Sequence, residues 1–240
     1  MNKRYIKFPY ESIHSTIAVN TKDINGIKYV KPEESIIFFG TENIAGDEYK
    51  INSQKPHTLK IGEDTYYQSN TDEIKEQINF QKRLDIMQQN FGNALLRLSI
   101  LKSTNLKVKN YKISHGENKI YLSYDDIVDI SLVDKLEEFS NYIINANLLI
   151  TNSHIDNEIS IKNLGKINYV GPCLNRTGEI GLIKITSITK ERGYVVVNLL
   201  AGNRAFKDYK NKFNLISELK HIFDTKDENQ LLNKIKGMKK

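Results

Sequence analysis

Two stretches of the chain carry residues that could build a chemical site. In the first, residues 83–101, Asn90 and Ala94 lie four residues apart, so a helix would stack them one turn above the other. In the second, residues 169–185, Cys173 is the only cysteine of the chain. A thiolate is a zinc ligand, and it is a nucleophile where a base lies nearby and its pKa is depressed. If the fold brings the two stretches together, they could form a metal site or a thiol site.

Neither chemistry finds its usual partners close by in the sequence. The chain has five histidines, all distant from Cys173: His14, His57, His115, His154 and His221. A buried structural thiol is therefore the alternative interpretation of Cys173. Asn90 and Asn93 can hydrogen-bond a substrate, or they can bond each other and the backbone.

The first stretch must be positioned by a helix. Its apolar residues recur at helical spacing and predict a long amphipathic helix with one apolar face: Leu84, Met87, Phe91, Leu95, Leu98 and Leu101. Residues 107–113 and 119–123 then predict a β-hairpin with its turn at 116–118. A second helix is expected to begin at the N-cap Ser131.

The second stretch is expected among strands. Residues 148–151 and 158–161 are strand candidates. Residues 182–188 and 193–199 predict two strands of one antiparallel sheet, and the valine run in the latter is typical of a strand buried on both faces.

Both ends of the chain show other patterns. The first 79 residues predict a small β-barrel with strands at 5–8, 16–19, 28–30, 35–39, 48–51 and 58–61. Residues 71–78 are charged and are expected to form a short helix or a linker. Near the C-terminus, a heptad-like stripe predicts a helix with Phe206, Tyr209, Phe213, Ile216, Leu219 and Phe223. Thr225 to Glu228 has the pattern of a capping box that opens a last helix.

Composition limits the class of protein. The net charge is +6 and the pI about 9.1, which allows a polyanionic partner but is also common in lysine-rich proteins that bind no nucleic acid. A single cysteine excludes an intramolecular disulfide and suits a reducing cytoplasm. Neither a membrane span nor a signal peptide is expected. We therefore expect a cytoplasmic protein without a membrane partner.

Several short motifs agree with one known family. Arg83, Ile86-Met87 and Leu95-Leu96 lie on the predicted helix, and Thr177-Gly-Glu-Ile-Gly181 precedes a predicted strand. Together they resemble the editing domain of alanyl-tRNA synthetase and its free-standing AlaX-type relatives, the second additional domain of threonyl- and alanyl-tRNA synthetases. That family carries Arg-x-x-Ile-Met-x-x-His-x-x-x-His-Leu-Leu and later Cys-Gly-Gly-Thr-His-Val-x-Asn-Thr-Gly-Glu-Ile-Gly. Two shorter matches add to the likeness, Ser114-His-Gly-Glu117 and Gly202-Asn-Arg-Ala205.

The resemblance implies a zinc site that this chain has lost. The family binds zinc through two helix histidines, a cysteine and a further histidine, and those positions fall here on Asn90, Ala94, Tyr169 and Cys173. Only Cys173 is a credible zinc donor, so we expect no cofactor. The glycine-rich Gly-Gly-Gly-Gln-Pro segment that lies near the family's editing pocket corresponds to residues 38–48, where neither the triple glycine nor the glutamine is present.

The resemblance also implies the rest of a substrate pocket. Besides the four metal positions, it would include Asn93, His115, Arg176, Thr177 and Glu179. Each has a structural alternative. His115 could be a surface residue of a hairpin, Arg176 an exposed side chain, and Thr177 and Glu179 the caps of a turn.

We therefore expect an α+β protein in three parts: an N-terminal small β-barrel at 1–79, an editing-type α+β domain with an antiparallel sheet at 80–204, and a C-terminal helical arm at 205–240. In longer AlaX-type proteins such an arm leads to a domain with a DHHA1-type motif, which is not present here. The arm could pair two copies of the chain as a homodimer.

The implied function is aminoacyl-tRNA editing, with tRNA(Ala) as the partner. The family deacylates Ser- or Gly-tRNA(Ala), and the missing ligands predict that this activity is impaired or lost. Three alternatives remain at this point: a non-catalytic module that binds tRNA or aminoacyl-tRNA, a metal-free hydrolase of another acyl ester, and a structural segment of a longer protein.

Overall fold

The long central helix is present, and the other elements surround it. The computed structural model of the chain describes residues 2–62, 64–125, 127–153 and 157–238. Helix α2 spans Phe80–Ser103, and its N-cap Asn79 accepts a hydrogen bond from the Lys82 amide through its side chain. Antiparallel sheets and further helices complete the molecule, which confirms the predicted α+β class.

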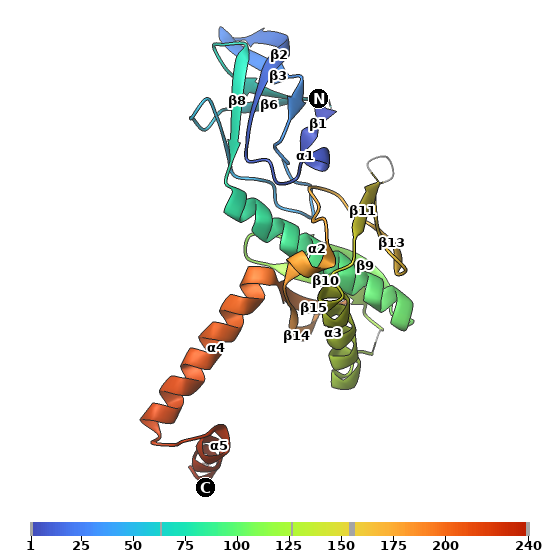
Figure 1. The fold of residues 1–240 in the computed structure, drawn as a ribbon, viewed down its shortest axis with the longest axis vertical. Helices are drawn as coiled ribbons and strands as arrows, with labels where there is room; N and C mark the ends of the chain where they lie inside the picture. The colour runs from blue at the N-terminus through green and yellow to red at the C-terminus, as the bar shows by residue number, and fades with distance from the viewer. Residues whose placement is uncertain (1, 63, 126, 154–156, 239–240) are drawn as a thin grey trace.

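The N-terminal region forms a curled antiparallel sheet beyond the start of α2 (Figure 1). Its strand order is β5-β8-β2-β3-β7-β6, with β2 Ile13–Ile24, β3 Ile27–Pro32, β5 Tyr49–Ile51, β6 Thr58–Ile61, β7 Asp64–Gln68 and β8 Glu73–Ile78. One side of the sheet buries an apolar cluster that includes Val30, Ile37 and Tyr67. Because β5 and β6 are edge strands that do not pair with each other, the predicted barrel is only half closed. We call this region the half-barrel.

Two of the expected N-terminal strands are different elements. A helical turn, α1, spans Arg4–Lys7, so residues 5–8 are not a strand. Strand β4 covers only Glu34–Ser35 and pairs in parallel with β1, Asn2–Lys3, while residues 36–39 continue without strand pairing. The apolar run Ile36–Phe39 is nevertheless largely buried, and this burial explains why it resembles a strand in the sequence.

Residues 71–78, expected as a short helix or linker, contain strand β8. Ile74, Glu76 and Ile78 alternate inward along it. The Glu76 carboxylate is buried and accepts hydrogen bonds from the Tyr67 hydroxyl at 2.9 Å and from the Ile36 amide at 2.8 Å. A buried carboxylate at an inward position hides the period of two that would identify the strand.

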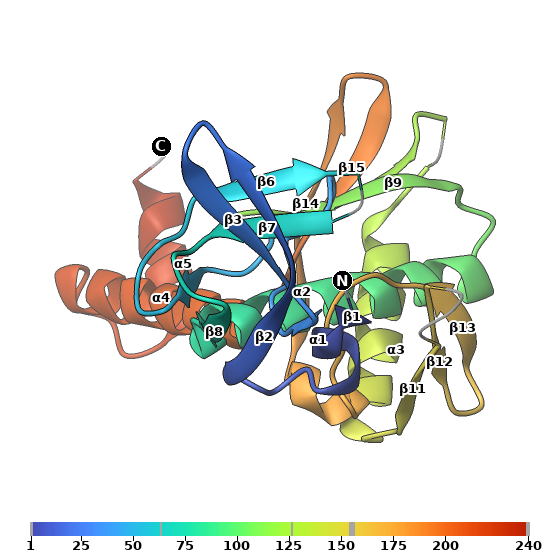
Figure 2. The ribbon, with the colours of Figure 1, turned by 90° about the horizontal axis from the view of Figure 1, so that it is seen from above.

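Helix α2 lies between two further antiparallel sheets (Figure 2). The four-stranded sheet has the order β14-β15-β10-β9, with β9 Val108–Ile113, β10 Asn118–Ser123, β14 Ile183–Glu191 and β15 Tyr194–Ala201. The three-stranded sheet has the order β11-β12-β13, with β11 Ile150–Ser153, β12 Glu158–Ile161 and β13 Gly165–Asn168. Helix α3, Ile130–Asn145, packs against α2 and begins at the N-cap Asp129 rather than at Ser131.

Burial extends around α2 rather than along one face. Every residue from Gln89 to Ile100 is buried, the polar ones included, whereas Leu101 at the end of the predicted stripe is exposed. The reason is the position of the helix between two sheets. The predicted hairpin is confirmed as β9 and β10, and the predicted antiparallel pair as β14 and β15.

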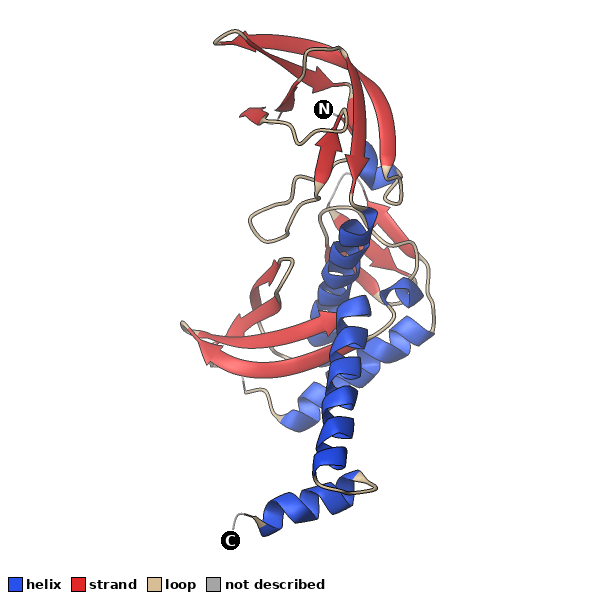
Figure 3. Ribbon diagram, turned by 90° about the vertical axis from the view of Figure 1, so that its left-hand side faces the viewer, coloured by secondary structure: helices blue, strands red, loops and turns tan. Residues whose placement is uncertain are grey.

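The C-terminal arm projects away from the body (Figures 1 and 3). Helix α4 spans Gly202–Ile222, and Gly202 and Ala205 are its only fully buried residues. Helix α5, Glu228–Gly237, folds back at the far end, where Leu231 is buried and Lys220 pairs with Glu228 at 3.0 Å. Its N-cap is Asp227 rather than Thr225. Among the residues that the structure describes, no helix combines the length and apolarity needed to cross a bilayer.

The apolar stripe predicted on α4 remains uncovered in the single chain. Phe206, Tyr209 and Phe213 are 60%, 64% and 59% exposed, and each leaves on the order of 100 Å² in water. Two such stripes packed face to face would bury roughly 1,000 Å² with their flanks, about the minimum for a specific dimer. The heptad-like spacing suits pairing with another helix of the same kind.

We predict that two copies of the chain pair through α4. Replacing Tyr209 and Phe213 together with serine removes the two central side chains of the stripe and should shift the protein from dimer to monomer in sedimentation velocity. Leu215→Ser is the matched control, because Leu215 is 56% exposed on the other side of the helix. A wild-type protein that stays monomeric up to about 100 μM, well above the Kd of a stable dimer, would contradict the prediction.

Candidate functional site

Arg83, which matches the family motif, joins α2 to the half-barrel. Its side chain is fully buried and forms an ion pair with Asp47, whose side chain is 3% exposed. Its Nε donates to Asp47 Oδ1 at 2.6 Å, and its two terminal nitrogens donate to the carbonyl oxygens of Pro9 at 3.0 Å and Ile36 at 2.6 Å. A bidentate pair with two further acceptors satisfies the buried guanidinium and fixes three segments to one another.

The same Asp47 closes the loop at 38–48, where the resemblance would place the family's glycine-rich segment. Its carboxylate accepts from the Phe38 amide at 2.7 Å, and its own amide donates to the Phe38 carbonyl at 2.8 Å. Gly46 lies against the Phe39 backbone, where a Cβ would come within 2.5 Å of the carbonyl carbon. The remaining glycines of this loop therefore permit a tight backbone crossing.

The loop also fills the space between the half-barrel and α2. It pairs with the end of β9 through Ala45 and Ile113, whose amide and carbonyl are 2.9 Å apart. A cluster of apolar side chains closes the junction: Tyr5, Phe38, Ile44, Ile86 and Ile113. Phe38 reaches Gly171, since a Cβ added there would lie 3.2 Å from its ring. This close packing leaves little room for a substrate between the loop and the second stretch.

The two stretches singled out in the sequence do meet. Asn90 Nδ2 donates to the Val170 carbonyl at 2.9 Å, and the Tyr169 hydroxyl donates to the Pro172 carbonyl at 2.8 Å. The amide of Asn90 and the thiol of Cys173 both act on the pKa of the same hydroxyl. Burial raises the pKa of Tyr169 well above its usual value. Ala94, Tyr169 and Cys173 all belong to one apolar core cluster.

This donor set does not fit zinc. Asn90 and Tyr169 use their protons on backbone carbonyls, and Ala94 offers no donor atom. Burial, and to a lesser degree the charge of Glu179, raise the pKa of the Cys173 thiol to about 12, although the Tyr169 hydroxyl opposes the shift. Zinc needs a deprotonated thiolate. In the described parts of the chain, no three His, Cys, Asp or Glu side chains come together.

None of the four histidines that the structure describes acts on the Cys173 thiol. His57 directly precedes β6 in the half-barrel. His14 lies in the half-barrel between Glu11 and Glu34, His115 is exposed at the tip of the β9–β10 hairpin, and His221 lies on the arm. His154 lies outside the described residues. The high pKa and the burial of the thiol support the structural interpretation of Cys173 over the nucleophilic one.

The Thr-Gly-Glu-Ile-Gly segment builds a turn. It forms a short 3-10 helix, η1, at Thr177–Ile180. The Thr177 hydroxyl donates to the Ile143 carbonyl at 2.8 Å and so holds the segment to α3. The Glu179 carboxylate accepts from the Arg176 amide at 2.9 Å and from the hydroxyl of Tyr10. Arg176 is exposed and donates to the Asn147 carbonyl at 3.0 Å. All these hydrogen bonds therefore have a structural role.

Asn93, one turn along α2 from Asn90, belongs to a second buried network. Its Nδ2 donates to Asn118 Oδ1 at 2.8 Å, and its Oδ1 accepts from Arg97 Nε at 2.9 Å. The Arg97 guanidinium stacks on the Tyr111 ring at 4.1 Å, and burial lowers its pKa. Gln89 bonds both Asn118 and the backbone of β15. The helical spacing of the polar residues on α2 was the only sequence signal for this network.

Two openings remain near these residues. A cleft of about 250 Å³ lies between the N-terminal segment and β11, and Lys7, Asn152, Cys173 and Asn175 border it. An adjoining cleft of about 350 Å³ includes Tyr10. Cys173 borders the first cleft, but its thiol is buried.

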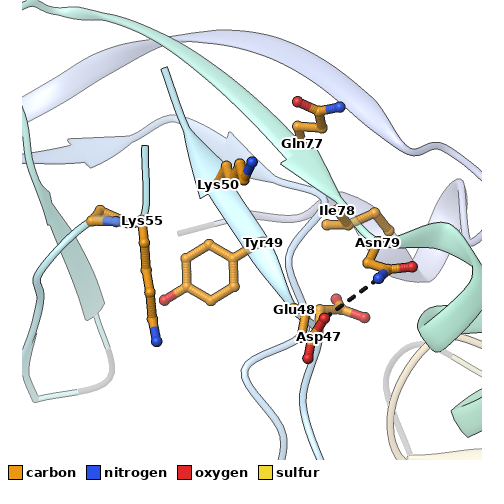
Figure 4. A pocket seen from close by; sticks show the side chains of 9 residues that line it. Asp47, Glu48, Tyr49, Lys50, Lys55, Gln77, Ile78 and Asn79 are labelled. Carbon is orange, nitrogen blue, oxygen red and sulfur yellow. Dashed lines mark hydrogen bonds between the residues drawn. The ribbon is translucent and has the colours of Figure 1, made fainter. Parts of the chain in front are cut away.

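A larger groove of about 510 Å³ lies along β5 in the half-barrel. Figure 4 shows the Tyr49 ring between Lys55 and the carboxylates of Asp47 and Glu48. Asp47 is neutralised by Arg83, and Glu48 pairs with Lys82. Lys50 and Lys55 therefore supply the unbalanced charge of this groove, which would suit an anion better than a cation.

A scan with protein-family models finds no match to the chain, and a search of curated proteins finds none either. The resemblance to the alanyl-tRNA editing domain therefore depends on the short motifs themselves. Residues 83–101 and 169–181, which carry the two longer motifs, are in contact through Asn90 and Val170.

We predict that breaking the Arg83–Asp47 pair strongly destabilises the protein. Arg83→Met leaves the Asp47 carboxylate buried and unpaired, which should lower the free energy of unfolding by about 3–5 kcal/mol. Urea unfolding followed by circular dichroism measures the change. Lys82→Met removes the exposed pair with Glu48 one residue away and should cost less than about 1 kcal/mol. Equal losses in the two variants would contradict the role assigned to the buried pair.

We also predict a pH dependence that comes from Cys173. Its pKa is about 12 in the folded chain and 9.0 as the ordinary value, so the folded state is disfavoured when the thiol ionises. The stabilisation is complete below pH 9 and is lost between pH 9 and 12, by at most about 1.4 kcal/mol per pH unit. Cys173→Ala should reduce this slope. Thiolate absorbance appearing below pH 10 in the folded protein would contradict the prediction.

Proposed function

We propose that the chain is a relative of the AlaX-type alanyl-tRNA editing proteins that binds tRNA, most specifically tRNA(Ala), without metal-dependent deacylation. The observation that carries this proposal is the meeting of Asn90, Tyr169 and Cys173. They occupy three of the four metal positions that the resemblance implies, and the Asn90 amide and the Tyr169 hydroxyl donate to backbone carbonyls. The chain would thus keep the fold of the family, with buried side chains in place of the zinc ligands.

Binding is favoured over metal-free hydrolysis of an acyl ester. A hydrolase that used Cys173 would need an accessible thiolate, and burial holds this thiol protonated. Glu179, whose charge acts on that pKa, already accepts three hydrogen bonds from Asn175, Arg176 and Tyr10. A carboxylate with its acceptor sites occupied is a weak general base.

The distribution of charge supports a polyanionic partner. Residues 80–204 carry 16 Lys and Arg against 12 Asp and Glu, and residues 205–240 carry 9 against 5, so each part has a net charge of +4. Residues 1–79 carry 10 against 12, a net charge of −2. A tRNA would therefore be attracted to the α+β body and the arm rather than to the half-barrel.

A binding titration at several salt concentrations tests the proposal. Labelled tRNA(Ala) should bind in fluorescence anisotropy, and log K should fall linearly with log salt concentration because phosphate contacts release counterions. An unrelated tRNA transcript measures specificity. Absence of binding at about 50 mM salt would favour the structural-segment interpretation and reject the proposal.

The matching prediction concerns activity. Ser-tRNA(Ala) should be deacylated at least about a thousandfold more slowly than by a zinc-bearing relative, because the metal's help in positioning and polarising the ester is worth several kcal/mol and each 1.36 kcal/mol is tenfold in rate. The measurement is release of labelled serine in a single-turnover assay, with EDTA-treated protein as the control. Metal-stripped protein that clears Ser- or Gly-tRNA(Ala) as fast as the zinc enzymes would reject a non-catalytic role.

A further inference from the structure

The four-stranded sheet has one face toward the core and one face away from it. Ile120 and Leu122 of β10 and Val195 and Val197 of β15 belong to the core cluster with α2 and α3. Side chains alternate along a strand, so the residues between them lie on the opposite face. We call this opposite face the outer sheet face and define it by Asn110, Lys112, Lys119, Tyr121, Tyr194 and Asn198.

Two tyrosines stand together on the outer sheet face. The register pairs Tyr121 with Val196 and Ser123 with Tyr194, which places the two rings on neighbouring strands. Their centroids are 5.7 Å apart at an interplanar angle of 76°. Tyr194 is 39% exposed and Tyr121 half-buried. An edge-to-face pair that is partly open to water offers ring surface on which a planar group can stack.

Two lysines lie beside the rings. Lys112, Lys119 and Asn198 are direct neighbours across β9, β10 and β15. Like charges directly opposite each other destabilise a sheet, and here Glu117 at the hairpin turn bridges both lysines at 3.3 Å. The four strands together carry five lysines and one glutamate. Lys119 also lies 3.9 Å from Glu191, so a phosphate of a bound strand would have to replace these two carboxylates at Lys112 and Lys119.

We infer that the outer sheet face binds a short single-stranded RNA segment, with bases stacked on Tyr121 and Tyr194 and phosphates near Lys112 and Lys119. This inference rests on the proposed function, because it assigns the surface that the tRNA would contact. Aromatic rings on an open sheet stack unpaired bases, whereas duplex bases are already stacked on one another. The amides of Asn110 and Asn198 supply hydrogen-bonding groups next to the rings.

The closing experiment uses the full chain with three probes: labelled tRNA(Ala), a single-stranded RNA hexamer and a blunt RNA duplex. Replacing Tyr121 and Tyr194 with leucine keeps apolar cover on the sheet and removes the stacking rings. The double variant should bind the hexamer and the tRNA about tenfold to a hundredfold more weakly than wild type. Tyr142→Leu is the matched control, because Tyr142 is 71% exposed on α3, and it should bind as wild type does.

A second pair of variants separates stacking from charge. Lys112→Gln with Lys119→Gln should lower the slope of log K against log salt by about 2, one for each phosphate contact. Ultraviolet crosslinking of the wild-type protein to the hexamer, read by mass spectrometry, should mark Tyr121 or Tyr194. This measurement holds even if a variant fails to fold.

The outcomes distinguish this inference from the proposed function. If wild type binds neither tRNA nor the hexamer, both fail. If wild type binds tRNA but the tyrosine variant binds equally well and the crosslinks map elsewhere, the outer sheet face is rejected and the proposed function stands. Equal affinity for the duplex and the hexamer would also overturn the inference, because stacking requires unpaired bases.

Discussion

The buried pair of Arg83 and Asp47 is the interaction on which the arrangement of the molecule depends. It connects the first turns of α2 to the loop before β5, and the same guanidinium holds the backbone at Pro9 and Ile36. Two buried charges are costly to desolvate, and the cost is offset only when every donor has an acceptor in good geometry. The half-barrel and α2 are therefore held in one relative position, and the loop at 38–47 is pressed against β9 and Gly171.

That fixed loop determines what the centre of the molecule can do. Phe38 and Ile44 fill the junction, and on the other side of Gly171 the phenol of Tyr169 occupies the core beside Asn90 and Cys173. A metal site with an open position needs ionised ligands and room for a substrate. Here burial raises the pKa values of the phenol and the thiol, and the hydrogen bond from Asn90 to the Val170 carbonyl ties the two stretches together. This geometry is the support for the proposed binding role at this position.

The two surfaces proposed for partners lie away from this closed centre. The outer sheet face offers rings and lysines to an unpaired polyanion, and α4 offers an apolar stripe to another helix. The two surfaces differ in their physics. Salt weakens contacts to phosphates but leaves apolar burial intact or strengthens it, so RNA binding and self-association are expected to respond to salt in opposite ways.

The sequence by itself determined the elements that have a clear period: α2, the β9–β10 hairpin, the β14–β15 pair and the arm with its exposed stripe. These follow from local spacing of apolar residues. Only the tertiary structure decided that Glu76 points inward on β8, that Gln89, Asn93 and Arg97 are buried, and that Asp47 is the partner of Arg83. The reason is that the spacing of apolar residues predicts only which face of an element is buried. A buried polar group also needs a hydrogen-bond partner, and here that partner lies far away in the sequence. Those partners come within hydrogen-bonding distance only once the sheets have packed around the helix.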